Sequence, residues 1–220
     1  MKVTVVVPTK NEARSVAETL KRAAKFADEL MIVDGHSTDD TISIAKKAVP
    51  SVKIIRQEGF GKGAGIRESI PHITGDVAVF IDADGSHIPE DIPKLVREIE
   101  KGADMAIASR FMGGSDEMTP LRFIMNKLVN FTINMLWGTG YTDTQNGFRA
   151  IRSDLLRRMD LKGEKFEIET EMCIKAAKLR ANVTEIPSHE FSRLHGVSNQ
   201  SLLRHGPYHL STVIRELFRK

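Results

Sequence analysis

The chain has 220 residues, of which 41% are hydrophobic and 28% are charged, as is usual for a globular protein with a sizeable core. Its net charge is only +3 and its basic residues are spread along the sequence, which argues against a nucleic-acid-binding protein and favours smaller anionic partners such as phosphates. A single cysteine, Cys173, excludes an internal disulfide. With neither a signal peptide nor a run of 18 apolar residues visible, we expect a cytoplasmic protein, soluble or peripheral to a membrane.

Strands and helices alternate through the first 110 residues. Apolar strands are predicted over residues 3–7, 30–33, 52–55, 77–81 and 105–108, and helices over residues 13–27, 37–48, 61–71 and 89–101. The strands are apolar throughout rather than alternating, as expected when helices cover both faces of a sheet. We therefore predict an α/β fold with a mostly parallel, doubly wound sheet.

The pattern changes after residue 110. Helices are predicted over residues 120–137, 166–179 and 206–220, and short strands over residues 147–152 and 183–186. The last helix is amphipathic, and its apolar face suits either an anionic membrane surface or the body of the protein. Since no linker or repeat separates the two parts, we expect a single domain over residues 1–220 with a C-terminal helical extension.

Polar clusters follow three of the strands, at residues 9–12, 34–40 and 82–87. Parallel strands end at one edge of a sheet, where such folds form a ligand crevice, so the three clusters should meet. Asp82 and Asp84 come directly after a buried strand, and two carboxylates so placed can share Mg²⁺ or Mn²⁺ with substrate phosphates. An isolated acidic turn is more often merely solvated, so the prediction depends on the position at the strand end.

Other segments carry weaker signals. The glycine-rich segment 59–65 would let backbone N–H groups approach an anion beside Lys62, or would form a flexible turn. The segment 143–149 suits a substrate-facing turn or a hairpin. Arg110, Arg122 and Arg193 have the forked geometry that binds phosphate, although each alone would more often be a surface ion-pair partner. Of the acidic residues 167–171, Glu169 or Glu171 could be a general base, and an exposed charged helix face is the alternative.

Together these segments resemble family 2 glycosyltransferases of the GT-A fold. The motifs Val5 to Glu12, Val33 to Thr41, Gly61 to Ala64 and Asp82 to Ser86 match that family in order and spacing. The later segments 109–111, 143–149 and 193–198 are similar to dolichyl-phosphate mannose and glucose synthases. The resemblance implies a nucleotide-binding half over residues 1–110 and an acceptor-binding half over residues 111–220.

The resemblance also implies a role for each matching residue. The nucleotide-sugar would be bound by Pro8, Glu12, Asp34, Lys62, Asp82, Ala83 and Asp84, and the metal by Asp82, Asp84 and Ser86. The lipid phosphate would be held by Arg110, Arg122, Asn126, Arg193 and Ser198, and the sugar by Asp143, Gln145 and Arg149. The groups expected to act in catalysis are Asp82, Asp84, Arg110 and Arg193.

The expected reaction moves a hexose from a nucleotide-sugar, with GDP-mannose favoured, to a polyprenyl monophosphate with inversion. Membrane contact would come from a peripheral helix or a membrane partner. Lys10, Gly35 and Asn126 depart from the synthase pattern, so UDP-glucose and UDP-GlcNAc stay open as donors. Two other functions stay open: transfer to a polysaccharide hydroxyl, which needs a base, and nucleotide-sugar binding without catalysis. A sugar nucleotidyltransferase is disfavoured because no glycine-rich loop follows the first strand.

Overall fold

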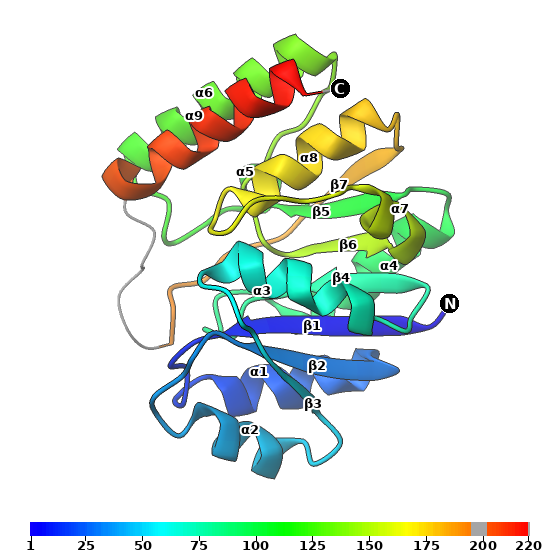
Figure 1. Ribbon diagram of the computed structural model, residues 1–220, viewed down its shortest axis with the longest axis vertical. Helices are drawn as coiled ribbons and strands as arrows, with labels where there is room; N and C mark the ends of the chain where they lie inside the picture. The colour runs from blue at the N-terminus through cyan, green and yellow to red at the C-terminus, as the bar shows by residue number, and fades with distance from the viewer. Residues whose placement is uncertain (195–201, 220) are drawn as a thin grey trace.

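The computed structural model describes residues 1–194 and 202–219, which form one seven-stranded sheet with helices on both faces (Figure 1). The strand order is β3-β2-β1-β4-β6-β5-β7. The strands are β1 (Val3–Thr9), β2 (Glu29–Asp34), β3 (Lys53–Arg56), β4 (Val77–Phe80), β5 (Met105–Ser109), β6 (Arg149–Arg152) and β7 (Val183–Pro187). All neighbouring pairs are parallel except those of β6, which is antiparallel to both β4 and β5. The predicted mostly parallel sheet is confirmed.

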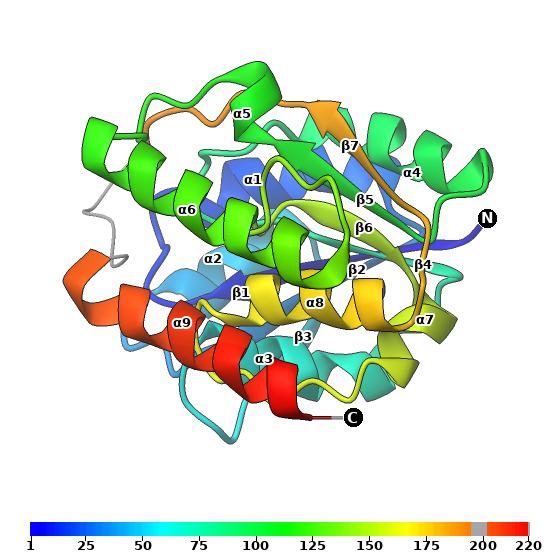
Figure 2. The same ribbon diagram turned by 90° about the horizontal axis from the view of Figure 1, so that it is seen from above.

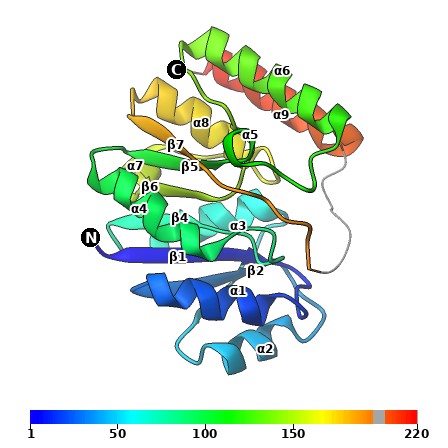
Figure 3. The same ribbon diagram turned by 180° about the vertical axis from the view of Figure 1, so that it is seen from behind.

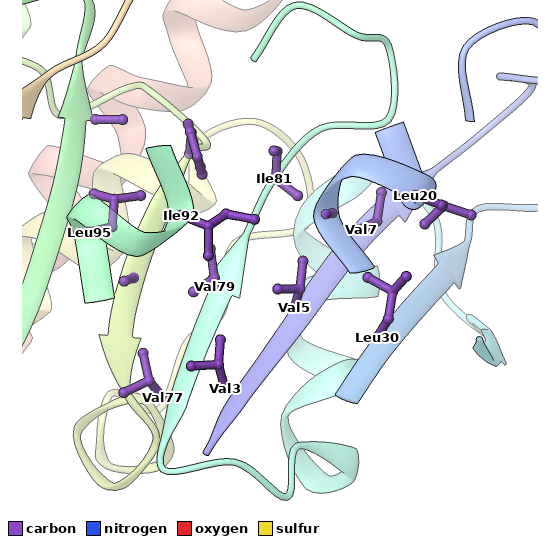
Figure 4. Close-up of a cluster of buried hydrophobic side chains, with 14 of the residues drawn as sticks. Val3, Val5, Val7, Leu20, Leu30, Val77, Val79, Ile81, Ile92 and Leu95 are labelled. Atoms are coloured by element: carbon purple, nitrogen blue, oxygen red, sulfur yellow. The ribbon is translucent and has the colours of Figure 1, made fainter. Parts of the chain in front are cut away.

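Each face of the sheet has its own hydrophobic core. One core lies under α1 (Val16–Ala23), α2 (Thr41–Ala48) and α4 (Ile92–Glu100), which Figure 3 shows from their own side. The other lies under α3 (Lys62–Ser69), α7 (Ser153–Arg158) and α8 (Ile168–Lys178). Figure 4 shows the first core, where alternate residues of β1 and β4 meet Leu20, Ile92 and Leu95. Short 3₁₀ turns span Ala24–Phe26, Ile70–His72 and Pro89–Asp91.

Two long helices, α6 (Pro120–Trp137) and α9 (Leu202–Phe218), lie side by side beyond α8 and form a further layer (Figures 1 and 2). The short helix α5 (Arg110–Gly113) precedes α6. The bounds of α6 follow from its sequence: Thr119 accepts a hydrogen bond from the N–H of Arg122, Pro120 occupies the first turn, and Gly138 ends the helix with φ of 65°. No helix within the described residues is long and apolar enough to cross a bilayer.

Strand register brings the predicted polar clusters to one edge of the sheet. Thr9 pairs with Asp34 across β1 and β2, and Val6 pairs with Phe80 across β1 and β4. Asp82, two residues beyond Phe80, therefore comes level with Pro8. The three clusters meet because β1, β2 and β4 are parallel and end together.

Candidate active site

A cleft opens at the carboxyl edge of the sheet. Most of its lining is polar or charged: Lys62, Asp82, Asp84, Ser86, His87, Arg110, Glu117, Arg122, Gln145, Asn146, Gly147, Phe166, Glu190 and Arg193. Lys62 and the acidic turn thus share one cavity with Gln145 and with the three arginines expected to hold the lipid phosphate.

Lys62 bridges two carboxylates at the floor of the cleft. Its Nζ lies 2.6 Å from Oδ1 of Asp82 and 2.8 Å from Oε1 of Glu169. Burial opposes the charge on Asp82, but Lys62, with His87 and Arg193, outweighs burial and lowers the pKa of the Asp82 carboxyl to about 2. Burial likewise opposes the charge on Lys62, and the two carboxylates outweigh it and raise the pKa of its ammonium. Both groups are therefore charged at neutral pH.

Asp84 is held from both sides. Its Oδ1 accepts hydrogen bonds from the N–H and the hydroxyl of Ser86, at 3.0 and 2.7 Å. Its Oδ2 lies 3.1 Å from a guanidinium nitrogen of Arg193. Arg193 follows β7 in the chain and contacts the acidic turn, so a long-range contact brings an arginine expected at the acceptor site to the expected metal-binding carboxylate.

The acidic turn fits a divalent cation in its donor chemistry. Asp82 and Asp84 offer carboxylate oxygens and Ser86 a hydroxyl, and all three line the same cleft. Mg²⁺ is commonly held by one or two carboxylates, with substrate phosphates and water completing its shell. Lys62 and Arg193 balance the two carboxylates here, and both are equally suited to pair with phosphate.

Arg110 is tightly paired to Asp143. Its Nε and Nη2 lie 2.8 and 2.9 Å from the two oxygens of Asp143, and Nη1 lies 3.5 Å from Oε1 of Glu190. Both partners of the main pair are buried. Burial opposes the charge on Asp143, but Arg110 outweighs it and lowers the pKa of the carboxyl. The expected acceptor residue Arg110 and the expected sugar residue Asp143 therefore form one unit beneath the cleft wall.

The loop that carries Asp143 and Gln145 is held by asparagines of α6 and by the buried Arg149. Asn130 Oδ1 accepts hydrogen bonds from the N–H and hydroxyl of Thr144, at 3.1 and 2.7 Å. Asn134 exchanges two hydrogen bonds with the backbone of Tyr141. Arg149 is fully buried and donates to backbone carbonyls, including that of Glu169 at 2.9 Å. We therefore assign Arg149, which does not line the cleft, to holding this loop rather than to touching the sugar.

The glycines of segment 59–65 serve close packing of two chain segments. A Cβ on Gly61 would lie 2.4 Å from the carbonyl oxygen of Glu164, and one on Gly63 would lie 2.6 Å from that of Gly163. The N–H of Ala64 donates to the Glu164 carbonyl at 3.0 Å. These glycines therefore let the start of α3 meet the loop before α8, which fixes the position of Lys62.

The expected nucleoside residues do not line this cleft; they lie at the ends of β1 and β2 or a few residues beyond β1 and β4. Asp34 is buried at the end of β2, where its Oδ1 accepts from the N–H of Ser37. Glu12 is partly buried and accepts from the hydroxyl of Ser15; burial, with Asp84 and Asp82 nearby, raises the pKa of Glu12. Pro8 precedes them at the strand end, and Ala83 is buried between the two aspartates.

Of the other expected acceptor residues, one does not line the cleft and one lies outside the described residues. Asn126 is buried on the inner side of α6, with its Nδ2 3.8 Å from Sδ of Met118. Ser198 lies outside the described residues. Arg122 does line the cleft, next to Arg110 and Glu190.

Glu167 directly precedes α8, and Glu169 and Glu171 lie in its first turn. All three are buried, so the alternative of an exposed charged helix face, expected for at least Glu167, is wrong. Glu167 accepts from the N–H groups of Glu164 and Lys165. Glu171 accepts from the N–H groups of Lys162 and Gly163 and pairs with Arg215 of α9. Glu169 instead faces Lys62. Sequence reasoning missed Glu117 and Glu190 in the cleft wall. His87 and Asn146 lie within the predicted polar segments 82–87 and 143–149, although no role was predicted for either of them.

A family model and the curated relatives reported below all point to glycosyltransferases. Residues 4–160 match the model described as glycosyl transferase family 2. The chain is 30% identical to glycosyltransferase AglJ of Haloferax volcanii over 99% of this chain and 71% of that protein. It is 32% identical to dolichol-phosphate mannosyltransferase of Pyrococcus furiosus, over 85% of this chain and only 56% of that protein.

Among solved structures, glucosyl-3-phosphoglycerate synthase of Mycobacterium tuberculosis, in complex with Mn²⁺, UDP and phosphoglyceric acid, superimposes with a TM-score of 0.78. The identity is 19%, over the whole of this chain and 79% of that one. Such a likeness shows the fold. With the family match over residues 4–160, it follows that the chain belongs to glycosyl transferase family 2 and has the GT-A fold.

Proposed function

We propose that the chain is an inverting, metal-dependent transferase that moves a hexose from a nucleotide-sugar, with GDP-mannose favoured, to a polyprenyl (dolichyl) monophosphate. The name of the Pyrococcus furiosus relative supports this acceptor class and this sugar. Because the chain spans little more than half of that relative, the acceptor has to be argued from this chain's own surface.

The observation that carries the proposal is the inverted polarity of α6. Its outward side holds a stripe of large apolar residues, each between 55% and 66% exposed: Leu121, Ile124, Leu128, Phe131 and Met135. Its inward side holds Asn126, Asn130 and Ile133. A helix that only packs on a globular protein turns its apolar stripe inward.

The neighbouring helix α9 repeats this arrangement. Leu210, Ile214, Leu217 and Phe218 are exposed, whereas His209, Thr212 and Glu216 are buried. His209 hydrogen-bonds to Thr170 of α8 at 2.8 Å, and Glu216 pairs with Lys175 and Lys178. We call the exposed apolar residues of α6 and α9 the apolar face; such a face suits the interface of a bilayer at the cytoplasmic membrane surface.

Two of the arginines that line the cleft lie at or just before the start of α6, in the layer formed by α6 and α9. Arg122 belongs to the first turn of α6, and Arg110 lies in α5 just before it. A polyprenyl phosphate whose chain stays in the lipid would thus present its headgroup to Arg122, Arg110 and Arg193. Guanidinium groups bind phosphate oxygens in a fixed, forked geometry.

The chemistry needs no general base, because a phosphate monoester is already an anion at neutral pH. One of its oxygens would bond to the anomeric carbon as the bond from that carbon to the diphosphate breaks, with inversion. The arginines would align the nucleophile, and Lys62 would offset charge on the departing diphosphate. A divalent ion held by Asp82, Asp84 and Ser86 would supply further charge stabilisation. A hydroxyl acceptor, in contrast, would need a base. Of the two candidates, Glu171 is already fully engaged and Glu169 is paired with the Lys62 ammonium.

The donor half of the proposal is tested by thermal stabilisation with GDP- and UDP-hexoses, with and without Mn²⁺. We expect one nucleotide-sugar to raise the melting temperature only when Mn²⁺ is present. Asp82→Asn and Asp84→Asn should lose this rise, and Asp154→Asn, an exposed residue that does not line the cleft, should keep it. A metal-independent rise, or one kept in both cleft variants, would refute the metal-dependent donor site.

A further inference from the structure

The loop before α8, residues 160–167, packs against the start of α3. A Cβ on Gly63 would lie 2.6 Å from a carbonyl oxygen of this loop, and the N–H of Ala64 donates to the carbonyl of Glu164 at 3.0 Å. Gly63 directly follows Lys62, whose ammonium lies at the floor of the cleft. The position of this loop therefore determines where the ammonium stands.

The same loop is held by an arginine of α9. A guanidinium nitrogen of Arg215 lies 3.1 Å from Oε1 of Glu171, a carboxylate that is fully buried. The carboxylate of Glu171 accepts hydrogen bonds from the N–H groups of Lys162 and Gly163, at 3.0 and 2.6 Å. Arg215 thus orients from one side the group that holds the loop from the other.

Two more side chains of α9 contact the loop directly. The hydroxyl of Tyr208 accepts a hydrogen bond from Nζ of Lys165 at 2.7 Å, and this ammonium also lies 4.2 Å from the centre of the Tyr208 ring. Arg219 pairs with Asp160 at 2.6 Å. Contacts from α9 therefore reach the loop near its beginning, at its middle and close to α8, and the loop joins α9 to α3.

α9 is held on the body of the protein mainly by polar contacts. His209 hydrogen-bonds to Thr170, and Glu216 pairs with two lysines of α8. The buried hydroxyl of Thr212 has no hydrogen-bond partner in the part of the chain that the structure describes. Polar groups exchange such partners for water when a helix leaves its place, so these contacts add little net stability. A bilayer bound to the apolar face contacts α6 and α9 together and therefore favours the position of α9 beside α6.

We propose that Arg215 is a positioning residue through which the membrane contact of α9 strengthens binding of the donor. When a bilayer holds α9 in place, Arg215 stays paired with Glu171, the loop stays against α3, and Lys62 stays where the diphosphate binds. This inference rests on the proposed function, which supplies both the bilayer and the donor, and adds a coupling between them. Such a coupling is reciprocal, so the donor strengthens membrane binding by the same factor.

The test measures binding of GDP and of UDP to the full chain in Mn²⁺ by calorimetry, with and without vesicles of equimolar phosphatidylcholine and phosphatidylglycerol. The vesicles should raise the affinity for the better nucleotide by about fivefold or more, the lower end of typical couplings between two sites. In co-sedimentation, that nucleotide should raise the affinity for vesicles by the same factor.

Variants of α9 separate positioning from plain stabilisation. Arg215→Ala should remove the coupling, and Arg215→Lys, which keeps the charge but not the forked geometry, should restore part of it. Tyr208→Phe, which removes only the hydroxyl that contacts Lys165, should reduce the coupling without leaving a buried charge unpaired. Arg97→Ala, at an exposed position of α4 on the opposite face of the sheet, is the matched control and should keep the full coupling.

A purely structural ion pair would lower the melting temperature of Arg215→Ala and leave the effect of the vesicles on nucleotide affinity intact. An effect of the vesicles that persists in both Arg215→Ala and Tyr208→Phe would therefore overturn the inference. Wild type that binds vesicles and nucleotide without any mutual effect would also overturn it, while leaving the proposed function standing. Failure of wild type to bind either nucleotide, or to bind the vesicles, would overturn both.

Discussion

Arg110 and Asp143 face each other through two parallel hydrogen bonds of 2.8 and 2.9 Å, and both side chains are almost completely shielded from water. One residue lies at the start of α5 and the other in the loop after α6, so the pair joins the two segments that flank the cleft. The Asp143 carboxylate also accepts from the N–H of Arg110 and of Gln145. The pair therefore positions the loop that carries Gln145.

Removing the charge of Asp143 should destabilise the protein. Asp143→Asn leaves the guanidinium of Arg110 buried with only the more distant Glu190, and breaking a buried pair on one side typically costs about 3–5 kcal/mol. Urea denaturation at pH 7 measures the loss. Asp154→Asn, which is exposed, should stay within about 0.5 kcal/mol of wild type. A loss in Asp143→Asn no larger than in this control would contradict the structural role of the pair.

The same pair should make stability fall in acid. The pKa of Asp143 is lower in the folded protein than in the unfolded chain, so below about pH 4 the unfolded chain binds the extra proton. The stabilisation is therefore present above about pH 4 and is lost as the pH falls through the folded pKa. Glu190, whose pKa Arg110 also lowers against the opposing effect of burial, contributes in the same direction. Urea denaturation at a series of acidic pH values gives the free energy of unfolding as a function of pH. This free energy should fall less steeply with decreasing pH in Asp143→Asn than in wild type, and equal slopes would refute the assignment.

The apolar face should bind lipid. Burying a leucine or phenylalanine side chain contributes about 1.5–3 kcal/mol, so Leu128→Glu with Phe131→Glu should weaken binding to vesicles containing anionic lipid by at least roughly a hundredfold. Both residues are exposed, so the free energy of unfolding should hardly change. Co-sedimentation with vesicles measures binding, and Lys47→Glu at an exposed position on α2, which changes the net charge by the same −2, is the charge-matched control. Undiminished sedimentation of the double variant would exclude this face as the membrane contact.

The sequence predicted which segments form strands and helices because apolar strands, proline, threonine and glycine act locally, although most helix bounds differ from the predicted ones by a few residues. The bounds of α6 were predicted to the residue, since Thr119, Pro120 and Gly138 specify them within the helix itself. The antiparallel insertion of β6 between β4 and β5 was missed, because pairing partners distant in sequence decide it.

For the site as well, the features that local sequence specifies were predicted, and those that depend on contacts distant in sequence were missed. The acidic turn and the strand-end clusters lie where their positions after strands indicated. The roles of Glu169, Glu171 and Arg149 depend on contacts across many residues, which a helical pattern alone does not contain. One signal was present in the sequence: Asn126, Asn130 and Asn134 recur every four residues in a mainly apolar helix, and two of them hold the cleft loop.

The most direct test of the central claim is transfer of labelled hexose from the donor that binds best, with Mn²⁺ or Mg²⁺, to short polyprenyl phosphate, the matching polyprenol and a polysaccharide in parallel. We predict a polyprenyl-phosphate hexose with inverted anomeric configuration, no product from the polyprenol or the polysaccharide, and loss of the product in Arg193→Ala. Transfer to a neutral hydroxyl with none to the phosphate would contradict the account.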